Sequence, residues 1–208
     1  MKNQIFNFLL CILCLSCATN PFTGKKTMAF MPNSQLLPMA FAEYDKFLSE
    51  NKVIKETSDA EMITRVGQRI SVAAERWLDA NGHHGYLKDY KWEYNLVDDK
   101  LVNAWCMPGG KIVFYTGILP IAKNEAGIAA IMGHEVAHAL ANHGQQRMSA
   151  GMIQQGAGIG VAIATKDKST AEQNMWMQAF AVGSSVGGML PFSRAHETEA
   201  DEIGLYLT

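Results

Sequence analysis

Gly133-His134-Glu135-Val136-Ala137-His138 is the stretch on which the fold and the chemistry of this chain depend, because it contains the pattern HExxH. Residues four positions apart lie on one face of an α-helix, about 6 Å apart along its axis. His134 and His138 can therefore bind one Zn²⁺ with both imidazoles, whereas Glu135 lies at the edge of that face. Zinc lowers the pKa of a water that it binds, and a glutamate at that edge can take the proton as the water attacks a carbonyl.

The residues around this pattern predict a helix from about residue 124 to residue 143. Strong helix formers are frequent in it; they are Ala126, Ala129, Ala130, Ala137, Ala139 and Ala141. Asn124 is suited to cap the N-terminus, and Gly144 stands where a C-terminal glycine is common. Ile128 and Met132 predict that the helix is buried, so the two histidines would stand on a rigid element.

A catalytic zinc ion needs a third protein ligand and one open position. His143 is the nearest candidate in the sequence, but on a continuous helix it would lie on the face opposite His134. The longer pattern HExxHxxGxxH is also missing, because Ala141 and Gly144 occupy the positions of its glycine and third histidine. We therefore exclude His143 as a ligand and expect it to cap the end of the helix, where a positive charge is favourable.

A better source of the third ligand is the segment 193–201, in which Glu197 and Asp201 are four positions apart. The two carboxylates share one helix face, so one can bind zinc while the other orients a ligand histidine through its ring N–H. Glu199 points about 200° away from Glu197 on a helix and is a poorer candidate. Such a pair alone is usually a solvated helix face, and its value here comes from the HExxH pattern upstream.

Three longer strings carry a family resemblance; they are Asn103-Ala104 through Pro108-Gly109-Gly110-Lys111-Ile112, Gly133 through His138, and Leu190-Pro191-Phe192-Ser193-Arg194 through Asp201. With HExxH and ExxxD they resemble the glutamate-zincins, in particular the HtpX and CAAX-prenyl-protease family of zinc metallopeptidases. The resemblance covers nearly the whole chain from residue 18. It implies an α+β fold, a zincin-like metallopeptidase domain that is mostly helical with a small β-sheet beside the HExxH helix.

The resemblance also implies a set of site residues. One Zn²⁺ per chain would be bound by His134, His138 and Glu197, with Glu135 as the catalytic residue and Asp201 as the partner of a ligand histidine. The strand around residues 111–116 would line the cleft. We expect it to be an exposed edge strand to which a substrate adds as a further strand, contacting Lys111, Ile112, Val113 and Phe114.

The activity that the resemblance implies is zinc-dependent cleavage of peptide bonds in protein or peptide substrates, such as misfolded proteins of the cell envelope. An alternative is a zinc-binding chaperone or assembly factor of the envelope with little proteolysis. Members of the family continue with a His-Pro segment that does not follow within the 208 residues, which favours this alternative. A zinc hydrolase that attacks another bond is a third interpretation, because the motif specifies an activated water and not its target.

The start of the chain predicts a targeting segment and a lipid anchor. Lys2 precedes an apolar run from Ile5 to Leu15, which has the length of a secretory signal and is too short to span a bilayer as a helix. Leu15-Ser16-Cys17-Ala18 resembles a bacterial lipobox, so we expect a lipid on Cys17 that attaches the protein to a membrane. A plain secretory signal cleaved nearby is the alternative.

The predicted organisation is a signal peptide over 1–16, a linker over 17–32 and a metallopeptidase domain over 33–208 that is truncated at its C-terminus. The lipobox and the loop 20–25 are similar to peripheral bacterial lipoproteins of the family. The location that follows is the bacterial cell envelope, with the protein anchored by its lipid in the outer membrane and facing the periplasm.

The remaining patterns predict elements around the HExxH helix. Helices are expected to start near Ser34, after Ser58 and near Ser193, and strands over 92–96 and 111–116. Segments 151–165 and 176–190 are rich in Gly, Ala and Met and nearly free of charge. We expect them to form helices packed around the HExxH helix, with contact to lipid as the alternative.

The composition is that of an ordinary globular chain, with 48% hydrophobic and 18% charged residues. A formal net charge of -2 leaves no basic footprint, so we predict no nucleic-acid partner. Cys106 is the one cysteine in the body of the chain and is predicted to be a small buried apolar residue.

Overall fold

The computed structural model describes residues 17–208 and has a four-stranded sheet at its centre, with the strand order β3-β4-β6-β5. Its strands are β3 (Val53–Ile54), β4 (Glu93–Val97), β5 (Ala104–Met107) and β6 (Lys111–Tyr115). β4 and β6 are parallel, and β3 and β5 are antiparallel to their neighbours. The predicted signal peptide lies outside the described residues.

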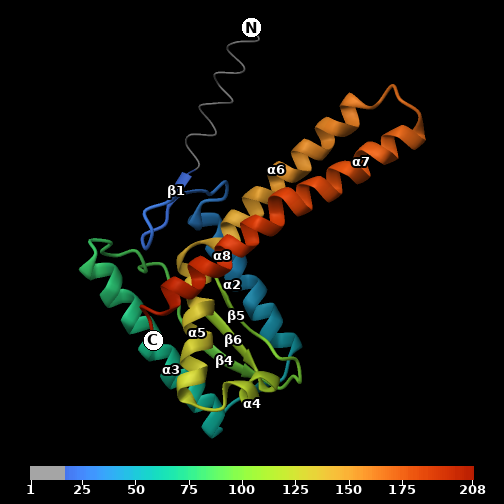
Figure 1. The fold of residues 1–208 in the computed structure, drawn as a ribbon. Helices are drawn as coiled ribbons and strands as arrows, with labels where there is room; N and C mark the ends of the chain where they lie inside the picture. Colours follow the sequence, from blue (N-terminus) through green and yellow to red (C-terminus); the bar gives the residue numbers. More distant parts are fainter. Residues whose placement is uncertain (1–16) are drawn as a thin grey trace.

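Side chains of β6 alternate between two apolar layers, because successive residues of a strand point to opposite faces of the sheet. Ile112 and Phe114 belong to a large core shared with α3 (Ser58–Ala80), α5 (Glu125–Leu140) and α8 (Leu190–Gly204). Val113 and Tyr115 face a smaller core formed with α2 (Asn33–Glu50). The helices therefore cover both faces of the sheet, with α5 on the same face as α3 (Figure 1).

The helices that begin near Ser34 and Ser58 are confirmed, with one shift. The cap of α3 is Thr57, whose hydroxyl accepts a hydrogen bond from the Ala60 amide, so the capping residue precedes the predicted Ser58. A 3₁₀ turn, η1 (Thr116–Ile118), and the short helix α4 (Leu119–Ala122) lead from β6 to α5. Strand β5 was not predicted; it precedes the turn at Gly109 and Gly110, both with positive φ.

Helix α5 starts as predicted and ends earlier than predicted. The Asn124 side chain accepts a hydrogen bond from the Gly127 amide, which confirms it as the cap. The helix stops at Leu140, because Asn142 adopts a left-handed conformation with φ 58° and α6 (His143–Ala164) begins directly after it. Asn142 therefore makes the break that the sequence assigned to Gly144.

The end of α5 is capped by two tyrosines. The Tyr86 hydroxyl donates to the Leu140 carbonyl at 2.9 Å, and the Tyr90 hydroxyl donates to the Ala139 carbonyl at 3.3 Å. The expectation that His143 caps this end is wrong, because the break at Asn142 turns His143 into the protein interior.

Helices α5 and α8 cross with their backbones in close contact. A Cβ atom on Gly204 would lie 3.2 Å from the backbone of Gly133 and His134, and a Cβ atom on Gly133 would lie 3.1 Å from the Gly204 carbonyl oxygen. Two glycines therefore allow α8 to approach the HExxH segment. Larger residues at this crossing would move the carboxylates of α8 away from the histidines of α5.

Helices α6 (His143–Ala164) and α7 (Thr170–Ser184) form an antiparallel hairpin that projects away from the sheet (Figure 1). The two helices meet where the Phe180 ring lies over Gly158 and where the Gln154 amide donates to the Ser184 hydroxyl at 2.8 Å. Helix α7 continues through a π-helical turn, η2 (Ser185–Met189), into α8. The hairpin thus connects the HExxH helix to the helix that carries Glu197.

The helices predicted over 151–165 and 176–190 are present, but their expected packing around the HExxH helix is wrong. The buried residues of α6 gather at its start, apart from Gly158, and α7 has no buried residue. Exposed apolar side chains follow both helices; they are Met152, Ile153, Ile159, Ile163, Met175, Trp176 and Val182. No helix within residues 17–208 combines the length and the apolar character needed to cross a membrane.

Residues 17–32 differ from the predicted linker. Strands β1 (Cys17–Thr19) and β2 (Lys26–Met28) pair in antiparallel fashion, and the loop between them packs on the body. Asn20 is buried and accepts a hydrogen bond from the Phe22 amide, while the Phe22 ring stacks on Trp77 at 4.2 Å. The turn chemistry of Asn20 and the apolar contact of Phe22 therefore fix this segment against α3.

The helix crossing predicts opposite effects of two glycine substitutions. Gly204→Ala should lower the free energy of unfolding by about 1–3 kcal/mol, because its methyl group would press on the backbone of α5. Gly156→Ala is the matched control on α6, where a Cβ atom meets nothing within 4 Å. It should raise the free energy of unfolding by up to about 1 kcal/mol. Urea unfolding of both proteins measures this, and equal stability would contradict the role of the crossing.

Candidate metal centre

His134, His138 and Glu197 bring their ligand atoms together where α5 and α8 cross, with all of these atoms within 4.8 Å of one another. The two Nε2 atoms are 3.1 Å apart. Oε2 of Glu197 lies 3.4 Å from Nε2 of His134, and Oε1 of Glu197 lies 3.5 Å from Nε2 of His138. The structure thus places the two helical histidines and the distant glutamate around one point.

The far nitrogen of each histidine is held by another side chain. Nδ1 of His134 lies 2.8 Å from the Asp201 carboxylate, which can only accept, so this nitrogen carries the proton. Nδ1 of His138 lies 2.8 Å from Nδ1 of His143. A proton on Nδ1 of His138 as well leaves two Nε2 lone pairs and a carboxylate facing each other, an arrangement that a cation stabilises.

The spacing of these three groups fits zinc. Ligands at about 2.0–2.1 Å from a tetrahedral zinc ion lie about 3.3–3.4 Å from one another. The two Nε2 atoms are 3.1 Å apart, and the two oxygens of Glu197 lie 3.4 and 3.5 Å from one Nε2 each, so the three side chains come close to the spacing that one zinc ion requires. Two imidazoles and one carboxylate are also a common donor set of catalytic zinc sites. Glu197 is half exposed, so one side of the cluster is open to solvent.

Glu135 follows the first histidine on α5 and is partly buried beside the cluster. Burial raises the pKa of this carboxyl group to about 7, while His134 lowers it and Glu197 raises it. Burial, with a smaller contribution from the charge of Glu135, raises the pKa of the Cys106 thiol on β5. Cys106 is partly buried and packs against the large core, close to the apolar role that was predicted.

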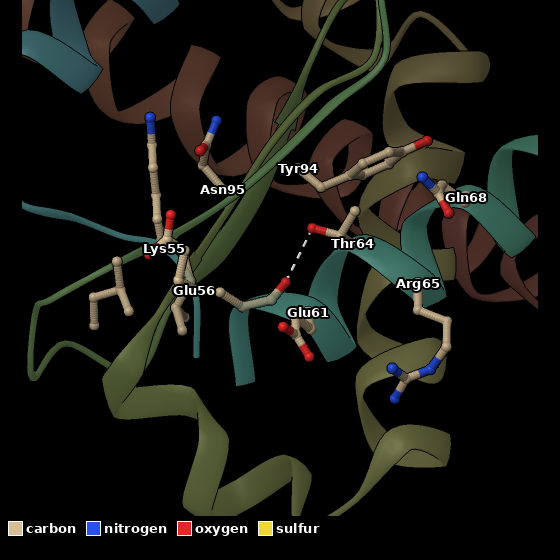
Figure 2. A pocket seen from close by; sticks show the side chains of 11 residues that line it. Lys55, Glu56, Glu61, Thr64, Arg65, Gln68, Tyr94 and Asn95 are labelled. Carbon is tan, nitrogen blue, oxygen red and sulfur yellow. Dashed lines mark hydrogen bonds between the residues drawn. The ribbon is translucent and has the colours of Figure 1, made fainter. Parts of the chain in front are cut away.

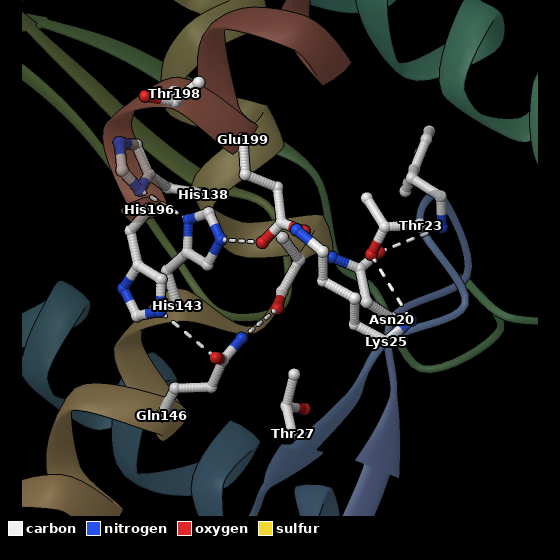
Figure 3. Close-up of polar contacts among 12 residues, drawn as sticks. Asn20, Thr23, Lys25, Thr27, His138, His143, Gln146, His196, Thr198 and Glu199 are labelled. Atoms are coloured by element: carbon white, nitrogen blue, oxygen red, sulfur yellow. Dashed lines mark hydrogen bonds and ion pairs between the residues drawn. The ribbon is translucent and has the colours of Figure 1, made fainter. Parts of the chain in front are cut away.

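The contact between two residues of this region, His143 and Glu199, was not predicted from the sequence. His143 is completely buried and, besides its contact with His138, lies 2.9 Å from the Glu199 carboxylate through Nε2 (Figure 3). Burial lowers the pKa of His143 and outweighs the opposite effect of Glu199. Glu199 was considered only as a metal ligand, and it indeed points away from the metal cluster. An isolated histidine and an isolated glutamate, 56 residues apart, carry no signal that they meet.

The prediction that residues 111–116 form an exposed edge strand is wrong. β6 lies inside the sheet, paired to β4 on one side and to β5 on the other. The four residues expected to contact a substrate are buried, and their backbone groups pair with β4 and β5; these residues are Lys111, Ile112, Val113 and Phe114. The sheet edge that lies against α5 is β5, so any strand added there would meet Ala104–Met107 and not β6.

A cavity of about 570 Å³ lies apart from the metal cluster, between the start of α3 and strand β4 (Figure 2). Its charged lining residues have opposite signs; they are Lys55, Glu56, Glu61 and Arg65. None of the residues around it belongs to the cluster of His134, His138 and Glu197. The cavity therefore contributes nothing to the chemistry of that site.

A family model described as peptidase family M48 matches residues 66–208, which is more than half of the chain and includes the whole metal cluster. The chain belongs to peptidase family M48. This confirms the predicted fold class, a mostly helical metallopeptidase domain with a small sheet, and a hydrolase of peptide bonds at the level of the family.

Several relatives of this M48 chain carry names. Mitochondrial metalloendopeptidase OMA1 of Schizosaccharomyces pombe is 38% identical over 121 residues, which cover 58% of this chain and 34% of the relative. Its namesake from Arabidopsis thaliana is 32% identical over 177 residues, covering 78% and 33%. A putative beta-barrel assembly-enhancing protease of Vibrio cholerae is 27% identical over 172 residues, covering 78% and 32%. The chain spans about a third of the length of these relatives.

The predicted localisation is contradicted by these relatives. The sequence predicted a bacterial envelope protein, anchored in the outer membrane and facing the periplasm. The relatives with 38%, 32% and 33% identity are all named mitochondrial metalloendopeptidases. The lipobox pattern covers only Leu15 to Ala18 and lies outside the matched peptidase domain. The matches show family M48 and do not single out its bacterial lipoproteins, and a lipid on Cys17 stays a prediction.

Metal-dependent stability tests the cluster. Zinc at 100 times its dissociation constant should raise the free energy of unfolding by about 2.7 kcal/mol, because it binds the folded chain. Glu197→Gln should lose most of this gain, since it removes a charged ligand atom. Glu202→Gln, an exposed residue of the same helix, should keep it. Urea unfolding with and without zinc measures the gain, and an equal gain in both variants would exclude Glu197 as a ligand.

Proposed function

We propose that this M48 chain is a zinc-dependent metalloendopeptidase with His134, His138 and Glu197 as metal ligands and Glu135 as catalytic base. The observation that carries the proposal is the convergence of two Nε2 lone pairs and one carboxylate at zinc-like separations. Membership of a metallopeptidase family supports peptide bonds as the target.

Three separate functions would come together at this site, one from zinc and two from side chains of the protein. Bound zinc would act as a Lewis acid that lowers the pKa of a water and polarises the carbonyl of the substrate. The Glu135 carboxylate accepts a proton from the attacking water and returns it to the amine that leaves. Asp201 holds the proton on Nδ1 of His134, which keeps Nε2 of this ring free to bind the metal.

The edge strand β5 is the surface that we propose for the substrate backbone. It pairs with β6 on one side and lies against α5, which carries Glu135. An extended peptide can add to such an edge with main-chain hydrogen bonds. The proposed substrates are therefore proteins or peptides with an extended segment. The narrower class of misfolded envelope proteins was implied by the family resemblance, and it also requires a bacterial location that the mitochondrial relatives contradict.

Replacement of Glu135 tests the proposed base. Glu135→Gln keeps the size of the side chain and loses the basic carboxylate, so cleavage of casein should fall by about 10²–10⁴-fold while zinc remains bound. Glu202→Gln serves as the matched control and should cleave like the unchanged protein. Cleavage rate and zinc content are measured on the same samples. A Glu135→Gln protein that cleaves at the normal rate would remove Glu135 from the mechanism.

A binding function with little proteolysis is the second candidate. The observation that favours it is the row of exposed apolar side chains along the α6–α7 hairpin. An exposed apolar surface of this kind is typical of contact sites for other molecules. The two candidates separate in one assay, because the Glu135→Gln protein would still suppress the aggregation of an unfolded client if binding is the function.

A further inference from the structure

His143 and Glu199 extend the metal cluster on the side of His138. His143 is fully buried, and its two ring nitrogens contact different partners, Nδ1 of His138 at 2.8 Å and the Glu199 carboxylate at 2.9 Å. The side chain of Glu199 is 8% exposed and its other oxygen lies 3.4 Å from the Lys25 ammonium group. The contacts form one continuous chain, from Lys25 through Glu199 and His143 to His138 (Figure 3).

The direction of this chain is set by its carboxylate end. A carboxylate only accepts hydrogen bonds, so Nε2 of His143 is the donor to Glu199. In a neutral His143 the remaining nitrogen, Nδ1, is then an acceptor. The donor that faces it is Nδ1–H of His138, which leaves the lone pair of His138 on Nε2. That atom is the one that faces His134 and Glu197.

We propose that His143 and Glu199 are positioning residues that fix His138 in the tautomer with its proton on Nδ1 and its metal-binding lone pair on Nε2. The inference rests on the proposed function, because it takes His138 as a zinc ligand. Asp201 accepts the Nδ1 proton of His134 directly, and His143 accepts the Nδ1 proton of His138 in the same way. Partners of this kind orient the ligand ring and raise its basicity.

The N-terminal loop takes part in this arrangement. Lys25 belongs to the segment between β1 and β2, and its ammonium group is the only cation within 4.0 Å of Glu199 among residues 17–208. Glu199 is buried, and a buried carboxylate is retained in its charged form by such partners. The loop 20–25 thereby helps to hold Glu199, the acceptor end of this series of contacts. The series thus links the N-terminal part of the described residues to His138.

His196 provides a control for the packing of His143. The two imidazole rings stack at a centroid distance of 4.0 Å, and His196 is also buried. However, Nε2 of His196 donates to the Gln146 side chain at 3.1 Å and lies outside the chain from Glu199 to His138. Replacement of either ring by leucine removes a buried, stacked imidazole. Only His143→Leu also breaks the series of contacts from Glu199 to His138.

The test measures zinc affinity of the full chain by competition with a chromophoric chelator. His143→Leu should weaken zinc binding by about 10–100-fold, the usual cost of losing a partner of a ligand histidine. His143→Gln should bind within a few-fold of the unchanged protein, because its amide can accept from His138 and donate to Glu199. His196→Leu should also stay within a few-fold. If His143→Leu does not fold, Glu199→Ala removes the same chain from its other end and should weaken binding similarly.

A second readout follows the tautomer directly. Long-range ¹H–¹⁵N spectra of the metal-free protein should show His138 with its proton on Nδ1, and in His143→Leu this preference should be lost. Normal affinity in His143→Leu, or an equal loss in His143→Leu and His196→Leu, would overturn the inference. So would a His143→Gln protein as weak as His143→Leu. If the unchanged protein binds no zinc, the proposed function fails instead, so the two failures are distinguishable.

Discussion

The backbone contact between α5 and α8 at Gly133 and Gly204 is the constraint on which the candidate metal centre depends. A helix carries its side chains at fixed angles and heights, so the distance between two helices decides which of their side chains can meet. At this crossing the separation is small enough for α8 to present its carboxylates directly to the imidazoles of α5. The sheet and α3 hold α5 from the other side through the large core, so the close approach has a rigid support.

Helix α8 supplies three carboxylates with different tasks. Glu197 faces both Nε2 atoms, Asp201 holds the far nitrogen of His134, and Glu199 holds His143 from the opposite side of the same helix. The difference in exposure follows these tasks, because the side chain of Glu199 is 8% exposed while those of Glu197 and Asp201 are 52% and 74% exposed. One helix thereby contributes to the orientation of both histidines of the proposed metal centre.

Local patterns predicted the parts of the molecule that depend on neighbouring residues. The HExxH helix and its cap Asn124 follow from helical geometry and capping preferences. The meeting of Glu197 with the two histidines was predicted from helical spacing together with the family resemblance. The role of His143 escaped prediction, because it depends on a left-handed Asn142 that ends α5 before the expected Gly144. The position of β6 inside the sheet escaped for a similar reason, since β5 is a strand of four residues without a strong alternating pattern. Both errors concern long-range pairing, which a local pattern does not encode.

The α6–α7 hairpin has both ends tied to the same small region. At its start, His143 is held by Glu199 and Gln146 by His196, and both partners stand on α8, which follows its end. The first turn of α6 is thus held against α8 at the base of the hairpin. Substitutions in its outer part should therefore leave the contacts of His143 and Gln146 with α8 unchanged. The exposed part of the α6–α7 hairpin is thus a segment whose sequence places little constraint on the proposed metal centre.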